Sequence, residues 1–328
     1  MLGPFYSYGL IAAAAGLMGL LMMLLTAKRF ALNRESVSWF GVLAVPLGLL
    51  AARLGYMLVC LNWCREHGMH LFFQFNQGGY ILYGAMAGVI LAGALTGKIT
   101  RQPVGRVLDA AAAPAALMIC ACRMGESLVR LGYGAGIEEW FDPYLMNASS
   151  FEWSDPSILY RFPLACQPDG FWRFSIFFWE ALAALVICLI LLKIRPRTSG
   201  GHGTLMVLLY AACQILLESM REDAVLRWGF VKINQLLSAL AIGAVLVICC
   251  LHLPQDWKKP GRIAAGWVLV LVCLGVVIAM EFALEQKISF LEWMHMDLCY
   301  LVMGLACLGL VLTVLPFWKR AFPRAEGR

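Results

Sequence analysis

The stretch "YGLIAAAAGLMGLLMMLLTA", residues 8–27, decides the fold of this chain. It carries no charged residue, and it is as long as the roughly 20 apolar residues that a helix needs to cross about 30 Å of hydrocarbon. Eight further, mainly apolar windows follow it at residues 38–60, 79–97, 107–128, 175–193, 203–220, 235–252, 264–282 and 297–317. The sequence therefore predicts an all-α integral membrane protein, built as a polytopic helical bundle.

The composition of the whole chain supports this fold class. Of its 328 residues, 61% are hydrophobic and only 14% are charged, and the mean hydropathy is +0.76. An average soluble domain has about 25% charged residues. This composition excludes an ordinary soluble protein.

Lysine and arginine concentrate in alternate loops, around residues 28–34, 98–106, 193–197, 258–262 and 319–324. Because cytoplasmic loops carry the excess of these residues, the amino terminus is predicted outside and the carboxyl terminus in the cytoplasm. The first cations, Lys28 and Arg29, follow the first apolar run, so this run is expected to remain as an anchor. The net charge of +6 then reflects topology and attraction to anionic lipids, and no nucleic-acid partner is expected.

The longest less apolar region, residues 129–174, is predicted to lie outside. It is rich in aromatic residues, prolines and acids, which is typical of an ordered head at the membrane interface. A plain surface loop is the alternative. Cys64 and Cys166 lie in predicted outer loops, where an oxidising compartment would permit a disulfide.

Ionisable side chains inside the predicted spans are the candidates for function, because charges in hydrocarbon are costly. Arg123, Glu126 and Arg130 recur at i, i+3 and i+7 and are predicted to share one helix face. A second stripe on the sixth span consists of Tyr210, Gln214, Glu218 and Arg221. A third group, near the outer ends of the second and fifth spans, consists of Arg53, Tyr56 and Glu180.

Two interpretations of these charges remain open. Arg123, Arg53 and Arg221 would pair with Glu126, Glu180 and Glu218 in a structural ion-pair network. Alternatively, one or two arginines bind an anionic headgroup, because a guanidinium matches phosphate oxygens in bidentate geometry. Asp109 is a separate case. It lies about 21 Å before Arg123 along a helix, near the predicted cytoplasmic end, and a structural role is expected for it.

A series of short motifs over residues 5–252 resembles the prolipoprotein diacylglyceryl transferase family. The motifs are "YSYGL", "AARLGYML", "GGYILYGAMAG", "DAAAAPAAL", "CRMGES", "FFWEA", "LLESMRE" and "INQLLS". The sequence departs from the family pattern in places: Glu126 stands where asparagine is expected, Gln214 replaces an arginine, Tyr83 replaces a common histidine, and a later Asn-Gly-Glu is absent.

The resemblance implies a division of the site residues into two sets. The catalytic set is Arg123, Tyr83, Glu126 and Glu180. The substrate-binding set is Arg123, Arg53, Tyr8, Tyr56, Tyr210, Gln214, Glu218, Arg221 and Gln235. Arg123 is expected to hold a phosphate, whereas Tyr83, Glu126 and Glu180 remain alternatives for assisting the thiol. No metal or other cofactor is expected.

The implied activity is transfer of the diacylglyceryl group from phosphatidylglycerol to the lipobox cysteine of a prolipoprotein signal peptide, with release of glycerol-1-phosphate. The implied location is the bacterial cytoplasmic (inner) membrane, in contact with membrane lipids. Residues 1–252 are expected to form the core and residues 253–328 an appended transmembrane hairpin with a cytoplasmic tail. The alternative is a catalytically altered family member that binds phospholipid or lipoprotein without this transfer.

Overall fold

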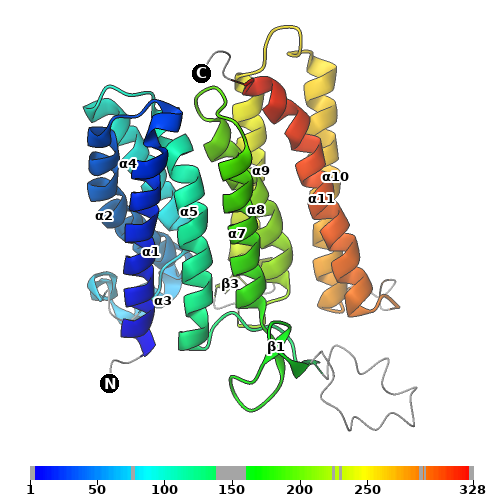
Figure 1. The fold of residues 1–328 in the computed structure, drawn as a ribbon. Coiled ribbons are helices and arrows are strands. Elements are labelled where there is room, and N and C mark those ends of the chain that lie inside the picture. Colours follow the sequence, from blue (N-terminus) through cyan, green and yellow to red (C-terminus); the bar gives the residue numbers. More distant parts are fainter. Residues whose placement is uncertain are drawn as a thin grey trace.

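The structure is a computed structural model that describes residues 4–74, 78–137, 160–223, 226–228, 231–287, 291 and 293–324. Its long helices run side by side in one bundle (Figure 1). They are α1 (Pro4–Thr26), α2 (Arg34–Val59), α4 (Leu82–Ile99), α5 (Val104–Glu126), α7 (Ile176–Lys193), α8 (Gly201–Ser219), α9 (Ile233–Leu251), α10 (Pro260–Leu284) and α11 (Met296–Ala321). Among the described residues, nine helical stretches are long and apolar enough to span a membrane, which confirms the nine predicted windows.

Short elements connect these helices. The helical ones are η1 (Ala27–Phe30), α3 (Leu61–His67), η2 (Met69–Phe73) and η4 (Ser127–Val129). The strands are β1 (Ala165–Cys166), β2 (Arg173–Phe174), β3 (Arg227–Trp228) and β4 (Val231–Lys232). β1 pairs with β2, and β3 pairs with β4, both antiparallel. These two small hairpins leave the architecture helical, as predicted.

Helix α5 lies at the centre of the amino-terminal half and packs against α1, α4, α7 and α8. Helix α2 packs mainly on α4, where small residues allow the backbones to approach closely. A Cβ atom at Gly84 would lie 2.5 Å from the carbonyl oxygen of Ala51, so any larger residue would force the two helices apart. The fold therefore uses glycine where two spans nearly touch.

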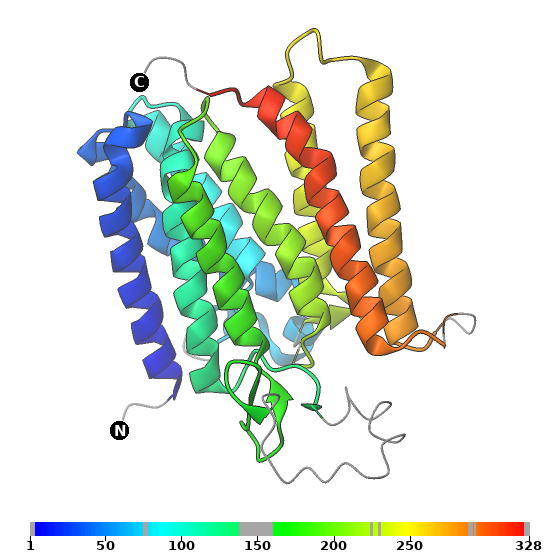
Figure 2. The ribbon, with the colours of Figure 1, turned by 45° about the vertical axis from the view of Figure 1, so that its right-hand side comes forward.

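Helices α10 and α11 pack on each other, and α11 also packs on α8 and α9 (Figure 2). Met303, Leu310 and Val314 of α11 are fully buried in the same apolar cluster as Leu208 and Leu246. The two helices that follow residue 252 are therefore joined to the rest of the bundle by a continuous apolar core.

The two ends of the bundle bear different parts of the chain. The end that bears the amino terminus, β1 and β2 is called the head end here, and the end that bears Arg324 is called the basic end (Figures 1 and 2). Residues 160–174 of the predicted head belong to the head end, whereas residues 138–159 lie outside the described residues. The loop of residues 194–200 lies at the basic end with the last residues of α11.

At the basic end, the carboxylate of Asp109 accepts three backbone hydrogen bonds from the start of α8. The donors are the N–H groups of Gly200, His202 and Gly203, at 2.7, 2.8 and 2.9 Å. Free N–H groups at a helix amino terminus favour such an anion. Asp109 therefore has the structural role that the sequence predicted.

The disulfide predicted between Cys64 and Cys166 is absent, and both thiols are free. Cys64 belongs to α3 and is fully buried, with its sulfur 3.3 Å from that of Met57 on α2. The Cys166 thiol instead lies 3.0 Å from the hydroxyl of Ser175. This prediction was wrong because each thiol packs against a local partner, which loop position alone does not reveal.

Candidate active site

The site is built on Arg123, in the last turn of α5. Arg123 is only 8% exposed. Its Nη1 lies 2.6 Å from Oε1 of Glu126, three residues later on the same helix. Helix α5 ends at Glu126, and Arg130 follows η4 with a φ of 55°, exposed to solvent or lipid. The prediction that Arg130 continues the helical stripe was therefore wrong, because α5 gives way to η4 after Glu126 and the chain turns at Arg130.

Glu180 in the first turns of α7 is the deepest carboxylate of the site, at 1% exposure. Its Oε2 lies 3.4 Å from Nη1 of Arg123 and 3.1 Å from Nη1 of Arg221. Oε2 of Glu126 also lies 3.1 Å from Nη1 of Arg221. Two buried arginines and two carboxylates from three segments thus form one cluster, called here the ionic cluster.

Arg221 follows the end of α8 and links the ionic cluster to the surface of the head end. Its Nη2 and Nε donate to the two carboxylate oxygens of Asp223, each at 3.0 Å. Asp223 in turn accepts the backbone N–H of Gly132 at 2.6 Å. Although burial opposes the charged form, Glu180 and Glu126 raise the pKa of Arg221, so it stays a cation.

Gln214 and Glu218 extend the ionic cluster along α8. The Gln214 amide donates to Oε1 of Glu180 and to Oε2 of Glu218, each at 2.9 Å. The amide of Asn234 on α9 donates to the other oxygen of Glu218 at 3.0 Å. A neutral donor therefore bridges two buried carboxylates at the position where the resemblance implies an arginine.

Three tyrosines line this region. The Tyr210 hydroxyl accepts a long hydrogen bond of 3.4 Å from Nη2 of Arg123. Tyr83 on α4 is hydrogen-bonded to Ser238 on α9, which joins two spans beside the cluster. Tyr8 on α1 packs on Gly125, where an added Cβ would lie 3.1 Å from its ring. All three belong to the predicted site residues.

Arg53 is placed differently from the prediction. It is buried on α2, where its guanidinium donates to the backbone carbonyls of Phe72, Gln74, Gly78 and Gly79. Within the described part of the chain it forms no ion pair with Glu126, Glu180 or Glu218. Its role in the ion-pair network was therefore predicted wrongly, because loop carbonyls are acceptors that a charge pattern does not show.

Tyr56 and Gln235 also make their contacts with residues outside the ionic cluster. The Tyr56 ring lies beside Arg53, with 5.8 Å between its centre and the guanidinium carbon. The Gln235 amide donates to the carbonyl of Ile215, at 2.9 Å, and to the carboxylate of Glu281 on α10. Gln235 therefore ties the bundle to α10 in this structure.

Three polar residues at the site were missed by the sequence prediction: Asp223, Lys232 and Asn234. Lys232 is 5% exposed, and its ammonium group donates to the carbonyls of Glu218, Ser219 and Arg221 at the end of α8. Burial lowers the pKa of Lys232. The signals were weak: Asp223 stands two residues after Arg221, and Asn234 directly precedes Gln235.

The arrangement offers cationic hydrogen-bond donors that suit an anion. Among the residues that the structure describes, no group of three or more histidine, cysteine, aspartate or glutamate side chains could hold a metal ion. A guanidinium offers five N–H donors in a fixed plane, and Arg123 directs its donors toward Glu126, Glu180 and Tyr210. An incoming phosphate would compete with these acceptors.

Most of this chain matches one known protein family. The family model of prolipoprotein diacylglyceryl transferase matches residues 2–251. The chain belongs to the prolipoprotein diacylglyceryl transferase family. The matched region contains every helix of the ionic cluster, and α10 and α11 lie beyond it.

Relatives with the printed name phosphatidylglycerol–prolipoprotein diacylglyceryl transferase share low identity with the chain. The one from Clostridioides difficile is 24% identical over 72% of this chain and 86% of its own length. One from Listeria monocytogenes is 26% identical, over 72% and 81% of the two chains. One from Bacillus licheniformis is 22% identical, over 80% and 92%. The chain is thus a divergent, multi-pass membrane member of this transferase family, which acts in lipoprotein maturation.

Proposed function

We propose that this chain transfers the diacylglyceryl group of phosphatidylglycerol to the thiol of a lipobox cysteine in a prolipoprotein signal peptide. Membership in the family supports this reaction. The observation that carries it to these residues is the convergence of two buried arginines, Arg123 and Arg221, on Glu180 near the head end of the bundle. Such cations match the charge and the depth of a phospholipid phosphate.

In the proposed reaction the cysteine sulfur attacks the glyceryl carbon that carries the phosphate ester. A sulfur–carbon bond forms, the carbon–oxygen bond breaks, and glycerol-1-phosphate leaves with the bonding electron pair. The thiol proton passes to a base, because the thiolate is the nucleophile. Arg123 stabilises the charge that grows on the leaving phosphate. Tyr83, Glu126 and Glu180 remain the three candidates for assisting the thiol.

Phosphate binding at Arg123 requires exchange of one of its acceptors. The side chain of Glu126 is 13% exposed, whereas that of Glu180 is fully buried. Glu126 is therefore the partner that a phosphate oxygen replaces, while Glu180 keeps the guanidinium oriented. Arg221, held by Asp223 at 3.0 Å, remains in place as the second cation.

We also propose an orientation of the chain in the membrane and a division into two parts. The head end faces outward, with the amino terminus outside and the carboxyl terminus in the cytoplasm, in the bacterial cytoplasmic membrane. Lysine and arginine in the loops of the basic end support this orientation. Residues 1–252 form the transferase core, and residues 253–328 form an appended hairpin and tail that pack on α8 and α9.

The test uses the full chain reconstituted in vesicles with phosphatidylglycerol labelled in its glycerol headgroup, together with a lipobox peptide. We expect labelled glycerol-1-phosphate and a diacylglyceryl peptide in equal amounts. Two controls must give neither product: the same peptide with serine in place of cysteine, and vesicles of phosphatidylcholine alone. Peptide binding with no released glycerol phosphate would contradict the proposal.

One observation favours a second candidate function, in which the chain binds phospholipid or lipoprotein without transfer. Counted together with Glu218 and Asp223 beside it, the ionic cluster brings four carboxylates near its two arginines. Excess negative charge opposes a phosphate. In the assay above, saturable binding of the peptide without either product would be the result expected from this second candidate.

A further inference from the structure

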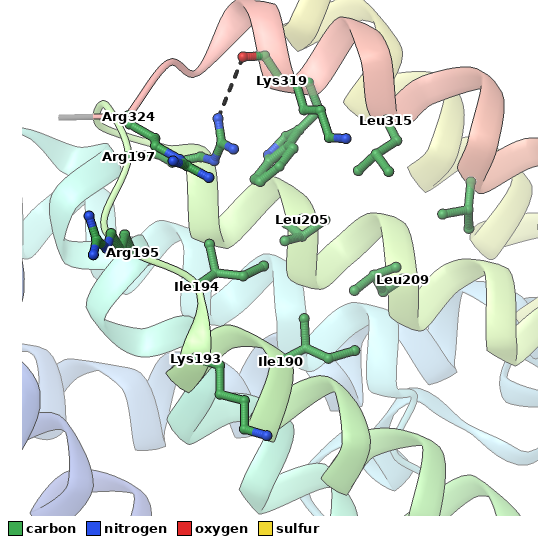
Figure 3. A pocket seen from close by; sticks show the side chains of 12 residues that line it. Ile190, Lys193, Ile194, Arg195, Arg197, Leu205, Leu209, Leu315, Lys319 and Arg324 are labelled. Carbon is green, nitrogen blue, oxygen red and sulfur yellow. Dashed lines mark hydrogen bonds between the residues drawn. The ribbon is translucent and has the colours of Figure 1, made fainter. Parts of the chain in front are cut away.

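A groove opens at the basic end between α7, α8 and α11, with a volume of about 670 Å³. Figure 3 shows aliphatic side chains of Ile190, Leu205, Leu209 and Leu315 across its centre. The volume lies inside the range of about 300 to 1,000 Å³ that is typical of small-molecule sites. Because α11 forms one wall, the groove lies partly outside the region that matches the family.

Among the residues that the structure describes, five cationic side chains and no acidic ones line this groove. The five are Lys193, Arg195, Arg197, Lys319 and Arg324. Within the ranges that the structure describes, none of them forms an ion pair with a carboxylate. Figure 3 shows Arg195, Arg197 and Arg324 together on one side of the aliphatic centre. The described part of the groove thus joins an apolar wall to a positively charged rim.

Arg197 is fixed in this rim by the protein itself. Its Nη1 donates to the carbonyl of Phe322 at 2.6 Å, and its guanidinium carbon lies 4.3 Å from the centre of the Trp318 ring. Its Nε is buried and has no hydrogen-bond partner among the described residues. Burial, and then the neighbouring Arg324, lower the pKa of Arg197. A preoriented cation therefore keeps one donor available.

We propose that this groove binds an anionic phospholipid of the leaflet at the basic end. The acyl chains lie along Ile190, Leu209 and Leu315, and the phosphate accepts hydrogen bonds from Arg195, Arg197 and Arg324. Basic pockets between spans on the cytoplasmic side are suited to such headgroups. The order of groups supports the assignment, because the aliphatic wall lies on the spans and the cations lie at their ends, as in a lipid.

This lipid site is distinct from the proposed transfer site. Leu205 in the groove and Glu218 in the ionic cluster are 13 residues apart on α8, which corresponds to about 20 Å along the helix axis. The headgroup of a phospholipid in the groove, which lies at the cationic rim, is therefore separated from Arg123 and Arg221 by most of the length of α8. The phospholipid would instead occupy the junction between the family core and the appended hairpin.

Photo-crosslinking of the full chain tests the proposal. The chain is reconstituted in phosphatidylcholine vesicles with a phosphatidic acid probe that carries a diazirine on one acyl chain. We expect adducts on the peptides that contain Ile190, Leu209 and Leu315. A phosphatidylcholine probe with the same chain, and an Arg195→Gln/Arg324→Gln double variant with the phosphatidic acid probe, should each yield about tenfold fewer adducts.

The matched control is an Arg34→Gln/Lys98→Gln double variant, which removes two exposed cations at the same end of the bundle but away from the groove. It should be labelled like the parent chain, and both double variants should unfold at the same temperature. Equal labelling by the two probes, or undiminished labelling of the Arg195→Gln/Arg324→Gln variant, would overturn the proposal. Phosphatidic acid is not the proposed donor, so this result does not depend on transfer.

Discussion

The ionic cluster and the groove at the basic end both contain arginines, but the surroundings of these arginines differ. At the head end, Arg123 and Arg221 lie within 3.4 Å of buried carboxylates. At the basic end, Arg195 and Arg324 line a groove in which the described lining residues include no aspartate or glutamate. A buried pair that loses one partner is strongly destabilising, whereas an unpaired cation at the interface is solvated and available. The partners of an arginine therefore decide whether an anionic ligand must first displace a carboxylate or can bind directly.

The largest effect is expected from Glu180→Ala. This substitution leaves Arg123 and Arg221 buried beside fewer carboxylates, so the free energy of unfolding should fall by about 3 to 5 kcal/mol. Denaturant unfolding in detergent micelles measures it. The control is Glu222→Ala, whose partner Arg173 is at the surface, with an expected change of about 0 to 1 kcal/mol. Equal changes for the two variants would remove the distinction between buried and exposed pairs.

The next effect concerns catalysis and Arg123→Lys. Lysine keeps the charge but loses the planar donor fork, so the initial rate of glycerol-1-phosphate release should fall by about 100-fold at unchanged protein level. Arg130→Lys is the control, because Arg130 lies after the helix end and is exposed. A parental rate for Arg123→Lys would show that Arg123 does not hold the phosphate. Loss of folded protein would instead identify it as a structural ion-pair residue.

Gln214 allows the charge balance of the cluster to be changed in both directions. In the parent chain, Glu180 and Glu218 share the amide of Gln214. Gln214→Arg would place a cation between these two carboxylates. We expect the KM for phosphatidylglycerol to fall by up to about tenfold, because local positive charge concentrates anionic substrate. Gln214→Glu should raise the KM. An unchanged KM in both variants would mean that the cluster field does not act on the donor lipid.

The smallest effect is expected for the stability of an Arg195→Gln variant. Arg195 is exposed at the rim of the groove, so its replacement should change the free energy of unfolding by no more than about 0.5 kcal/mol in lipid-free micelles. Arg29 is the matched contrast at the same end. It donates to the carbonyls of Leu192 and Ile194 at 2.7 and 2.6 Å, and Arg29→Gln should cost about 1 to 3 kcal/mol. Comparable decreases in the free energy of unfolding for the two variants would show that Arg195 also stabilises the fold.

The spans were predictable because hydropathy over about 20 residues reports the bilayer directly. The meeting of Arg123, Glu126, Glu180 and Arg221 was also foreseen, since buried charges of opposite sign must pair. The alternative in which Arg53 joins the ion-pair network was not confirmed, because its acceptors are loop carbonyls, which every sequence contains; its substrate-binding role stays a prediction. Arg130 was misassigned because periodicity does not reveal that α5 ends at Glu126.

The groove was not predicted at all, for a different physical reason. Its walls come from α7, α8 and α11, and α11 begins at Met296, which is 77 residues after the end of α8 at Ser219. Each wall is an ordinary apolar helix face when it is read alone. Only tertiary packing brings Leu209 and Leu315 to one cavity and places Arg324 beside Arg197.

The contact between Asp109 and the start of α8 bears on how the chain enters the membrane. The donor at Gly200 lies 91 residues after Asp109, so it does not yet exist when α5 leaves the ribosome. Until then the carboxylate, which stands near the start of α5, must remain hydrated at the interface. The carboxylate of Asp109 therefore exchanges water for backbone N–H donors only after the start of the sixth span has been synthesised, so this contact between the fourth and sixth spans forms late.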